Sequence, residues 1–237
     1  MNFFVMNNIL KDFNSKTIAL LGVVKENEHN EREVLFLGTC FKIYQNYYLT
    51  CFHVLDLSKQ LVISFPNEID GFFDVAKKQK FQCADIRLIA KDTRNDIALI
   101  KVNGNYLHFG HENKPVDILE TNLKDIGNDV VYAGYPFCHQ EMTSLKWSKT
   151  IISSKILSPK KTKQYMLDSV VHQGNSGGPL IDLNTGKVVG IISMTYNPMF
   201  GAGIMFGNQP LSSTTSLGMA ISIIHAINLL KSVNIYE

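Results

Sequence analysis

The sequence predicts an all-β protein, either a barrel or a sandwich, and two observations lead to that prediction. Short apolar runs separated by polar turns recur along most of the 237-residue chain, while few windows have the spacing of an amphipathic helix. Hydrophobic residues make up 45% of the chain and charged residues 19%, which is sufficient for a large packed core and atypical of a disordered chain.

The expected elements follow in order from the amino terminus. Phe3, Met6, Leu10 and Phe13 recur at helical spacing, so we expect a helix within residues 1–15 that packs on the domain or docks a partner. After Lys16 the pattern changes to short apolar runs, which we interpret as strands. These runs are 17–24, 33–43, 47–52, 60–65, 81–90, 96–102, 129–136, 150–157, 165–171, 179–182, 188–195 and 217–221.

Two turns and one further helix complete the expected organisation. The charged stretch 25–33 should be an exposed hairpin tip, and residues 182–187 should form a tight hairpin. Residues 222–232 have the apolar spacing of an amphipathic helix, with Ser222 as its N-cap.

Charge and cysteine usage exclude several classes of partner. The net charge is +2 and the pI about 8.2, less basic than is usual for a nucleic-acid-binding protein. No run approaches the roughly 18 apolar residues of a membrane span, and the first ten residues lack the features of a signal peptide. The four cysteines form no CxxC pair, so we expect a cytoplasmic protein with free thiols, no cofactor and no metal.

The segment VVHQGNSGGPLID, residues 170–182, suggests a reactive serine. Gly174, Gly177 and Gly178 surround Ser176, although an ordinary loop needs only one or two glycines. Such a loop can supply a nucleophile together with backbone N–H donors for an oxyanion, here those of Gly174 and Ser176 with Asn175 between them. Most glycine-flanked serines are simply tight turns, so this segment alone is a weak signal.

A catalytic serine needs a base and a carboxylate that orients the base. His53 follows an apolar strand, and Asp96 opens the apolar strand 96–102. Taken singly, each has an ordinary structural interpretation: His53 as a core histidine hydrogen-bonded to the backbone, and Asp96 as a turn aspartate. With Ser176 they give the order His, Asp, Ser, which is one of the few arrangements known for catalytic triads.

At these positions the chain resembles trypsin-fold serine proteases, most closely the protease domain of the HtrA (Deg) group. The segments that carry the resemblance are GTCFKI (38–43), YLTCFHVL (48–55), DTRNDIALIKV (92–102), IGNDVVYAGYPF (126–137), LDSVVHQGNSGGPLIDLNTGKVVGI (167–191) and LGMAIS (217–222). The resemblance implies two antiparallel six-stranded β-barrels with the active site between them. We place the barrels at 16–110 and 111–221, after an N-terminal segment at 1–15 and before a C-terminal helical segment at 222–237.

The resemblance also assigns roles to the matching residues. Ser176 is expected to be the nucleophile, His53 the general base and acid, and Asp96 the orienting carboxylate, acting on a protein or peptide substrate. Asn175 stands where digestive trypsins carry an aspartate, so we expect no activation by an inserted N-terminal ammonium group. Asp168 is expected to order the nucleophile loop.

Substrate contacts are likewise implied by the family pattern. The expected lining of the pocket for the residue before the cut is Val170, Val171, His172, Ile192, Met194, Thr195 and Gly218. Ser193 to Thr195 are expected to pair in antiparallel fashion with the substrate backbone. Because Val170 replaces the buried aspartate of trypsins, a basic side chain would have no counter-charge there, and we expect small to medium apolar residues. His172 leaves open a hydrogen bond to a Gln or Glu side chain.

Several readings stay open at this point. HtrA proteins generally carry a PDZ domain, and this chain ends after the helix, which argues against PDZ-type peptide sensing and favours a regulated protease for a specific partner, in a stress or phage-defence role. The alternatives are general protein quality control and a catalytically silent peptide-binding module. An activating partner or homo-oligomer also remains open. A metal-dependent reading rests only on His108 and His111, and a zinc site on Cys138 and His139.

Overall fold

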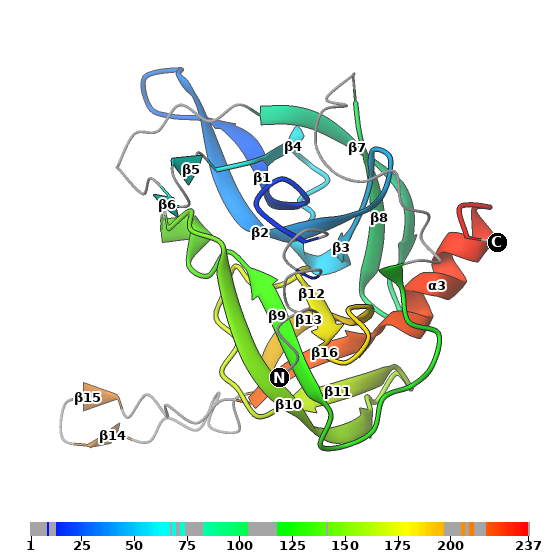
Figure 1. Cartoon of the computed structure of the whole chain (residues 1–237). Helices are drawn as coiled ribbons and strands as arrows, with labels where there is room; N and C mark the ends of the chain where they lie inside the picture. The colour runs from blue at the N-terminus through cyan, green and yellow to red at the C-terminus, as the bar shows by residue number, and fades with distance from the viewer. Residues whose placement is uncertain are drawn as a thin grey trace.

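The computed structural model describes residues 9, 13–66, 68–69, 72–73, 83–103, 118–140, 142–196, 205–206, 209–210 and 217–236. Their architecture is two closed antiparallel six-stranded β-barrels, stacked one above the other in Figure 1. Each sequence segment that we expected to form a strand contains one. The junction between the expected barrel ranges, residues 104–117, lies outside the described residues, as do His108 and His111.

The first barrel closes in the order β1-β2-β3-β8-β7-β4. Its strands are β1 (Ile18–Glu26), β2 (Arg32–Tyr44), β3 (Tyr47–Cys51), β4 (Leu61–Ser64), β7 (Cys83–Asp92) and β8 (Ile97–Val102). A 3-10 turn, η1 (Phe52–Val54), directly follows β3, and two short strands, β5 (Glu68–Ile69) and β6 (Phe72–Phe73), pair outside the barrel. The charged stretch 27–31 is an exposed turn between β1 and β2, as expected.

The second barrel closes in the order β10-β11-β16-β13-β12-β9. Its strands are β9 (Asp129–Gly134), β10 (Lys146–Leu157), β11 (Lys163–Leu167), β12 (Pro179–Asp182), β13 (Val188–Tyr196) and β16 (Leu217–Ser222). The turn η2 (Cys138–Gln140) follows β9, and the short strands β14 (Met205–Phe206) and β15 (Gln209–Pro210) pair away from the barrel. Residues 182–187 form the expected tight hairpin, since the Asp182 N–H donates to the Lys187 carbonyl at 2.9 Å.

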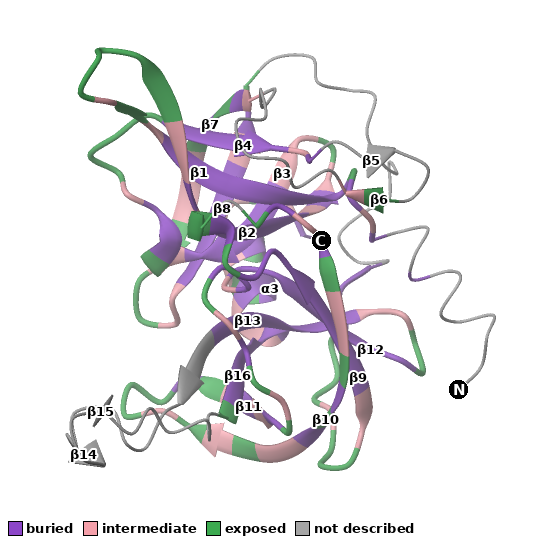
Figure 2. Ribbon diagram, turned by 90° about the vertical axis from the view of Figure 1, so that its left-hand side faces the viewer, coloured by how far each residue is buried: buried purple, intermediate pink, exposed green. Residues whose placement is uncertain are grey.

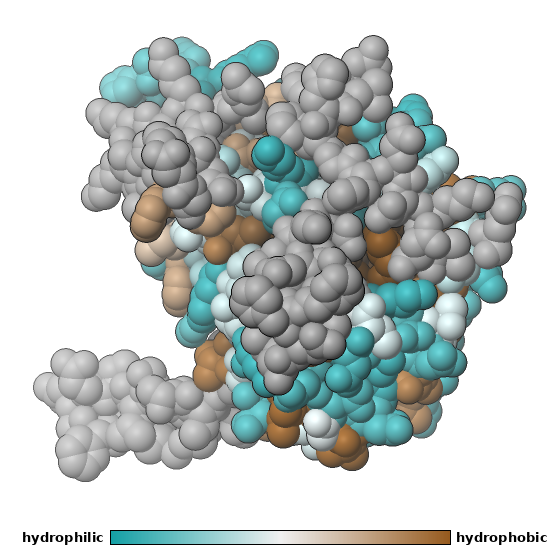
Figure 3. Space-filling view, viewed as in Figure 1, coloured by the Kyte–Doolittle hydropathy of each residue, from teal (hydrophilic) through white to brown (hydrophobic). Residues whose placement is uncertain are grey.

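One cluster of buried apolar residues spans both barrels, and a second lies within the second barrel. The strands are mostly buried, whereas the hairpin tips are exposed (Figure 2). Polar contacts also join the barrels, because the fully buried Tyr135 hydroxyl donates to the Ile18 carbonyl at 2.7 Å. In the view of Figure 3, the described surface of the second barrel is largely hydrophilic, with separate hydrophobic areas.

The C-terminal helix α3 (Ile223–Ser232) packs against both barrels. It buries Ile223, Ala226, Ile227 and Leu230, the single apolar face that the sequence pattern predicted. Ser222 occupies the N-cap position, but its buried hydroxyl makes no capping bond within the described part of the chain, so the side-chain cap that we expected does not form. No helix in the described part of the chain is long and apolar enough to span a membrane.

The expected N-terminal helix is described only in part. Ile9 and Phe13 are buried, and the Phe13 N–H donates to the Ile9 carbonyl at 2.8 Å, a helical spacing. Phe13 therefore packs on the domain as its position in the pattern predicted. The other three members of the pattern, Phe3, Met6 and Leu10, lie outside the described residues.

Candidate active site

Strand pairing brings the predicted base and carboxylate together. His53 lies in η1, one turn after β3, and Asp96 directly precedes β8. Because β3 and β8 are neighbours in register, the end of one strand lies beside the start of the other. His53 Nδ1 lies 2.6 Å from Asp96 Oδ2, and the His53 backbone N–H donates to Oδ1 at 2.8 Å. A carboxylate only accepts, so Nδ1 carries the hydrogen and Nε2 is left to accept a proton.

Asp96 lies in a more open and more polar environment than a fully buried carboxylate does. Its side chain is 28% exposed and is therefore only partly buried. Its backbone has a φ of 59°, a left-handed conformation, and its carbonyl accepts the Phe52 N–H at 3.1 Å. The Ser193 hydroxyl approaches Asp96 Oδ2 at 3.4 Å, a long contact on the side away from solvent.

The nucleophile loop is a series of tight turns that requires glycine. The Asn175 N–H donates to the His172 carbonyl at 3.1 Å, and the Gly178 N–H donates to the Asn175 carbonyl at 3.0 Å. Gly177 has a φ of 90°, and a Cβ there would lie 2.0 Å from the Thr39 carbonyl oxygen. A side chain would therefore meet both backbone strain and a clash, which explains the glycine beside Ser176.

Two backbone donors of this loop are available for a ligand. Within the described residues, the N–H groups of Gly174 and Ser176 have no acceptor. The preceding carbonyl, that of Gln173, accepts the Phe137 N–H at 2.7 Å, which turns the Gly174 N–H to the opposite side. Asn175 lies between them, with its N–H bonded to His172 and its buried side chain facing Gly134. It therefore offers no donor to an oxyanion and only spaces the two that do.

Thr39 supports this loop, and sequence reasoning did not single it out. Its buried hydroxyl donates to the Gly174 carbonyl at 2.7 Å and accepts the Tyr135 N–H at 3.1 Å. Its backbone N–H donates to the Ser176 carbonyl at 2.9 Å. The available signal was a hydroxyl residue in the apolar strand 33–43, next to Gly38.

The Ser176 hydroxyl donates to the Ser193 carbonyl at 2.6 Å, rather than to His53. Ser193 is the extra residue of a β-bulge, since Ile192 pairs with Ala220 and Met194 with Met219. A bulge leaves the extra residue outside the ladder, which frees its carbonyl for the serine. Ser176 and His53 nonetheless line one cavity of about 410 Å³.

The expected substrate-binding residues are brought together only in part. Val170, Val171 and Gly218 are adjacent, because the Gly218 N–H donates to Ser169 at 2.8 Å and a Cβ on Gly218 would meet Val171 at 2.7 Å. Ile192 is fully buried in the core of the second barrel, so it does not form the pocket wall that we expected. For Met194 and Thr195 only the backbone, paired with β16, is described.

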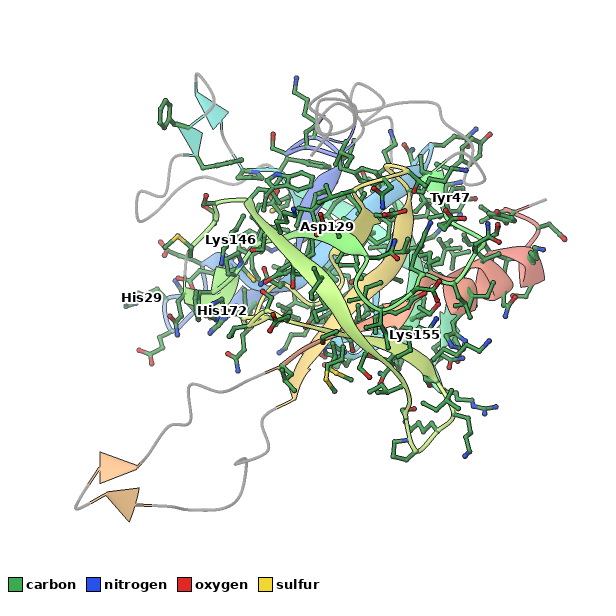
Figure 4. All side chains as sticks on the ribbon, turned by 60° about the horizontal axis from the view of Figure 1, so that its bottom comes forward. His29, Tyr47, Asp129, Lys146, Lys155 and His172 are labelled. Carbon is green, nitrogen blue, oxygen red and sulfur yellow. The ribbon has the colours of Figure 1, made fainter. Side chains whose placement is uncertain are left out.

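His172 lies at the edge of the loop. Its ring packs on that of Phe137, with centroids 4.9 Å apart, and its side chain lies close to Lys146 (Figure 4). Burial and the nearby ammonium group lower the pKa of His172, so the ring is uncharged at neutral pH. A neutral imidazole has one donor and one acceptor and fits an amide or apolar group better than a cation.

One cluster of side chains that could ligate a metal ion lies in the candidate active site itself. Among the described residues, Cys51, His53 and Asp96 have ligand atoms within 4.8 Å of one another. Burial, together with the charge of Asp96, raises the pKa of the Cys51 thiol well above its usual value. The thiol is therefore protonated at neutral pH and donates to the Ile192 carbonyl at 3.2 Å, which makes it a poor metal ligand.

Comparison with known proteins gives a consistent result. Residues 38–191 match the family described as trypsin-like peptidase domain. A probable periplasmic serine protease, do/HhoA-like, from Haemophilus influenzae is 32% identical over 165 residues, covering 65% of this chain and 32% of that protein. A probable periplasmic serine endoprotease, DegP-like, from Bartonella henselae is 35% identical over 130 residues, covering 51% of this chain and 23% of that protein. The chain thus spans a third or less of the length of these curated relatives.

Solved structures match over almost the whole chain. The HtrA-type protease AlgW, solved with a decapeptide, superposes with a TM-score of 0.65 at 17% identity, covering 96% of this chain and 67% of that one. The serine endoprotease from Yersinia pestis has a TM-score of 0.62 at 18% identity, covering 96% and 65%. At these identities the likeness establishes the fold.

Proposed function

The chain belongs to the trypsin-like peptidase domain family, and from this premise we propose that it is a serine endopeptidase that uses Ser176, His53 and Asp96. The observation that carries the proposal is the 2.6 Å contact between His53 and Asp96 on the wall of the cavity that Ser176 also lines. The two N–H groups without an acceptor, those of Gly174 and Ser176, supply the oxyanion donors that such a reaction needs.

The proposed reaction has two halves. His53 Nε2 takes the Ser176 proton as the serine oxygen attacks the peptide carbonyl, and the Gly174 and Ser176 N–H groups bind the resulting oxyanion. His53 then gives that proton to the leaving amine as the C–N bond breaks, leaving an acyl-serine ester. In the second half a water molecule gives its proton to His53 and attacks the ester, and His53 returns the proton to the departing Ser176 oxygen.

We further propose a regulated enzyme that acts on a specific partner, in a stress or phage-defence role, and the orientation of the serine supports the regulated part of this proposal. Because its hydroxyl donates to the Ser193 carbonyl, Ser176 must give up that hydrogen bond before His53 can take its proton. The Ile192 N–H and carbonyl pair with Gly178 and Gly177, and beyond Ile192 no described backbone pairs with β13 on that side, so a peptide strand can pair there. An N–H from such a peptide competes for the Ser193 carbonyl and releases the serine.

Labelling with a fluorophosphonate probe tests the catalytic proposal directly. Wild-type protein should be labelled, and the Ser176→Ala and His53→Ala variants should not. Ser148→Ala is the matched control, because the buried Ser148 hydroxyl has no hydrogen-bond partner in the described part of the chain and its loss should leave labelling unchanged. Wild-type protein that stays unlabelled with and without added peptides would instead support a silent peptide-binding module.

The biological role is tested by substrate breadth. Efficient degradation of casein and of heat-denatured proteins would favour general quality control. Cleavage of one co-encoded protein at one site, with casein left intact, would favour the regulated protease. Labelling that rises when a peptide or a partner is added would support activation of this kind, and sedimentation with and without the partner would identify any homo-oligomer.

We also propose a cytoplasmic location. The four cysteines are all free, which suits a reducing compartment, whereas the two relatives above are named as periplasmic. Cell fractionation of the native host tests this proposal, and recovery in the periplasmic fraction would overturn it.

A further inference from the structure

The cavity beside the nucleophile has an apolar wall that none of the expected substrate-binding residues contributes to. Phe36 and Leu37 of β2 and Val54 and Leu55 at and after η1 form this wall. The volume of about 410 Å³ falls within the roughly 300–1,000 Å³ usual for ligand pockets. The cavity is therefore large enough for an amino-acid side chain and its flanking backbone.

A bulge in β2 builds this wall. Leu21 of β1 pairs with Gly38 and Gly22 pairs with Phe36, so Leu37 is the extra residue between them. In a regular strand, Phe36 and Leu37 would point to opposite faces of the sheet. Because the bulge adds one residue here, Phe36 and Leu37 both border the cavity, and Leu37 is the half-buried member of the pair.

The position of this wall relative to the catalytic groups identifies the part of a substrate that it meets. A scissile carbonyl above Ser176, with its oxygen toward the Gly174 N–H, directs its leaving nitrogen toward His53, because His53 protonates that nitrogen. The acyl side then lies toward the Ser193 carbonyl and β13, which do not border the cavity. Chain beyond the leaving nitrogen passes over His53 onto Val54, Leu55 and Leu37.

We propose that this wall, which we call the leaving-side pocket (Phe36, Leu37, Val54 and Leu55), binds a large apolar side chain on the residue that follows the cleaved bond. The proposal rests on the proposed peptidase function and adds a second specificity site to it. Asp56 at the rim is paired with Lys59 at 2.9 Å and hydrogen-bonded to Ser58, so its charge is already compensated. Apolar burial against Leu37 thus decides the preference.

Acyl transfer measures this pocket separately from acylation. An N-acetyl-valine thiobenzyl ester acylates Ser176 and releases benzyl thiol, which reports the peptidase chemistry alone. Added amino-acid amides then compete with water: the amine nitrogen gives a proton to His53 and attacks the ester carbonyl, and His53 returns that proton to the Ser176 oxygen. The ratio of N-acetyl-valyl-amino-acid amide to free N-acetyl-valine reports binding on the leaving side.

Leucine amide and phenylalanine amide should capture the acyl group at least about tenfold better than glycine amide at equal concentration. Leu37→Glu should remove this preference and favour lysine amide. Leu35→Glu is the matched control, since Leu35 is half-buried two residues earlier on β2 and does not border the cavity, and it should keep the wild-type order. Circular dichroism melts of both variants establish that they fold.

Each outcome is decisive. Thiol release above the Ser176→Ala background with equal capture of leucine, lysine and glycine amides overturns the leaving-side pocket while the peptidase function stands. A Leu35→Glu effect as large as that of Leu37→Glu also overturns it. Thiol release no faster than the Ser176→Ala background, both with and without added peptides, overturns the peptidase function and this inference together.

Discussion

Replacing Thr39 by valine tests how the nucleophile loop is held. Valine has the shape of threonine but lacks the hydroxyl, which here donates to the Gly174 carbonyl at 2.7 Å and accepts the Tyr135 N–H at 3.1 Å. The change leaves both buried groups unpaired, at about 1–3 kcal/mol each, so the free energy of unfolding should fall by about 2–6 kcal/mol. Against the 5–15 kcal/mol typical of a domain, this loss is large.

The rate of catalysis should also fall, in addition to the loss of stability. The reason is that the Thr39 hydroxyl holds the Gly174 carbonyl, and so fixes the orientation of the residue whose N–H is a proposed oxyanion donor. Losing one oxyanion donor costs about 10²–10³ in kcat, so a displaced donor should slow fluorophosphonate labelling by at least tenfold under conditions where the variant is folded. Thr39→Ser keeps the hydroxyl and should cost only about 0.5–1.5 kcal/mol for the lost methyl group. Urea unfolding and labelling rates are the measurements. Valine and serine variants with equal unfolding midpoints and equal labelling rates would refute this reasoning.

Three further predictions concern the proposed triad, the glycines and His225. Asp96→Asn should lower kcat/KM about 10⁴-fold in a peptide assay, since an amide stabilises the wrong imidazole tautomer; a loss under tenfold would contradict the proposed role. Gly177→Ala, with its Cβ 2.0 Å from a carbonyl oxygen, should prevent folding or nearly so, whereas Gly186→Ala, with no atom nearer than 3.6 Å, should cost about 1 kcal/mol in urea unfolding. Burial lowers the pKa of His225, so the unfolded chain binds more protons as the pH falls through about 6.5. The contribution of His225 to stability is therefore fully present above that pH and is lost as the pH falls toward the lowered pKa of the folded state, where the acceptor for the Lys163 N–H is protonated. A His225→Gln variant should show a flatter dependence of the unfolding midpoint on pH.

Local pattern predicted the fold well because strand periodicity and chain reversals are short-range properties. Each expected apolar run contains a strand, and the tips at 27–31 and 182–187 are turns. Ser222 shows the limit of this reasoning, because a residue type favoured at N-caps occupies that position without making the bond. The hydroxyl is buried where β16, paired with β13, meets α3, a tertiary feature that no local pattern encodes.

The candidate site was predicted residue by residue, but its internal contacts were not. The proximity of His53 and Asp96 follows from the pairing of β3 with β8, which the sequence indicated only through a family resemblance. The hydrogen bond from Thr39 to the Gly174 carbonyl joins residues more than a hundred positions apart. The hydrogen bond from Ser176 to the Ser193 carbonyl depends on a β-bulge. Periodicity has no information about such contacts.

By itself, the sequence identified the candidate catalytic residues, because glycine-flanked Ser176, His53 and Asp96 are identifiable from residue type and order. Only the tertiary structure decided where the Ser176 hydroxyl points and which side of the nucleophile has an apolar wall. Both features depend on β-bulges, at Ser193 and at Leu37. A bulge is a mismatch in length between two paired strands, so it exists only once the strands have met.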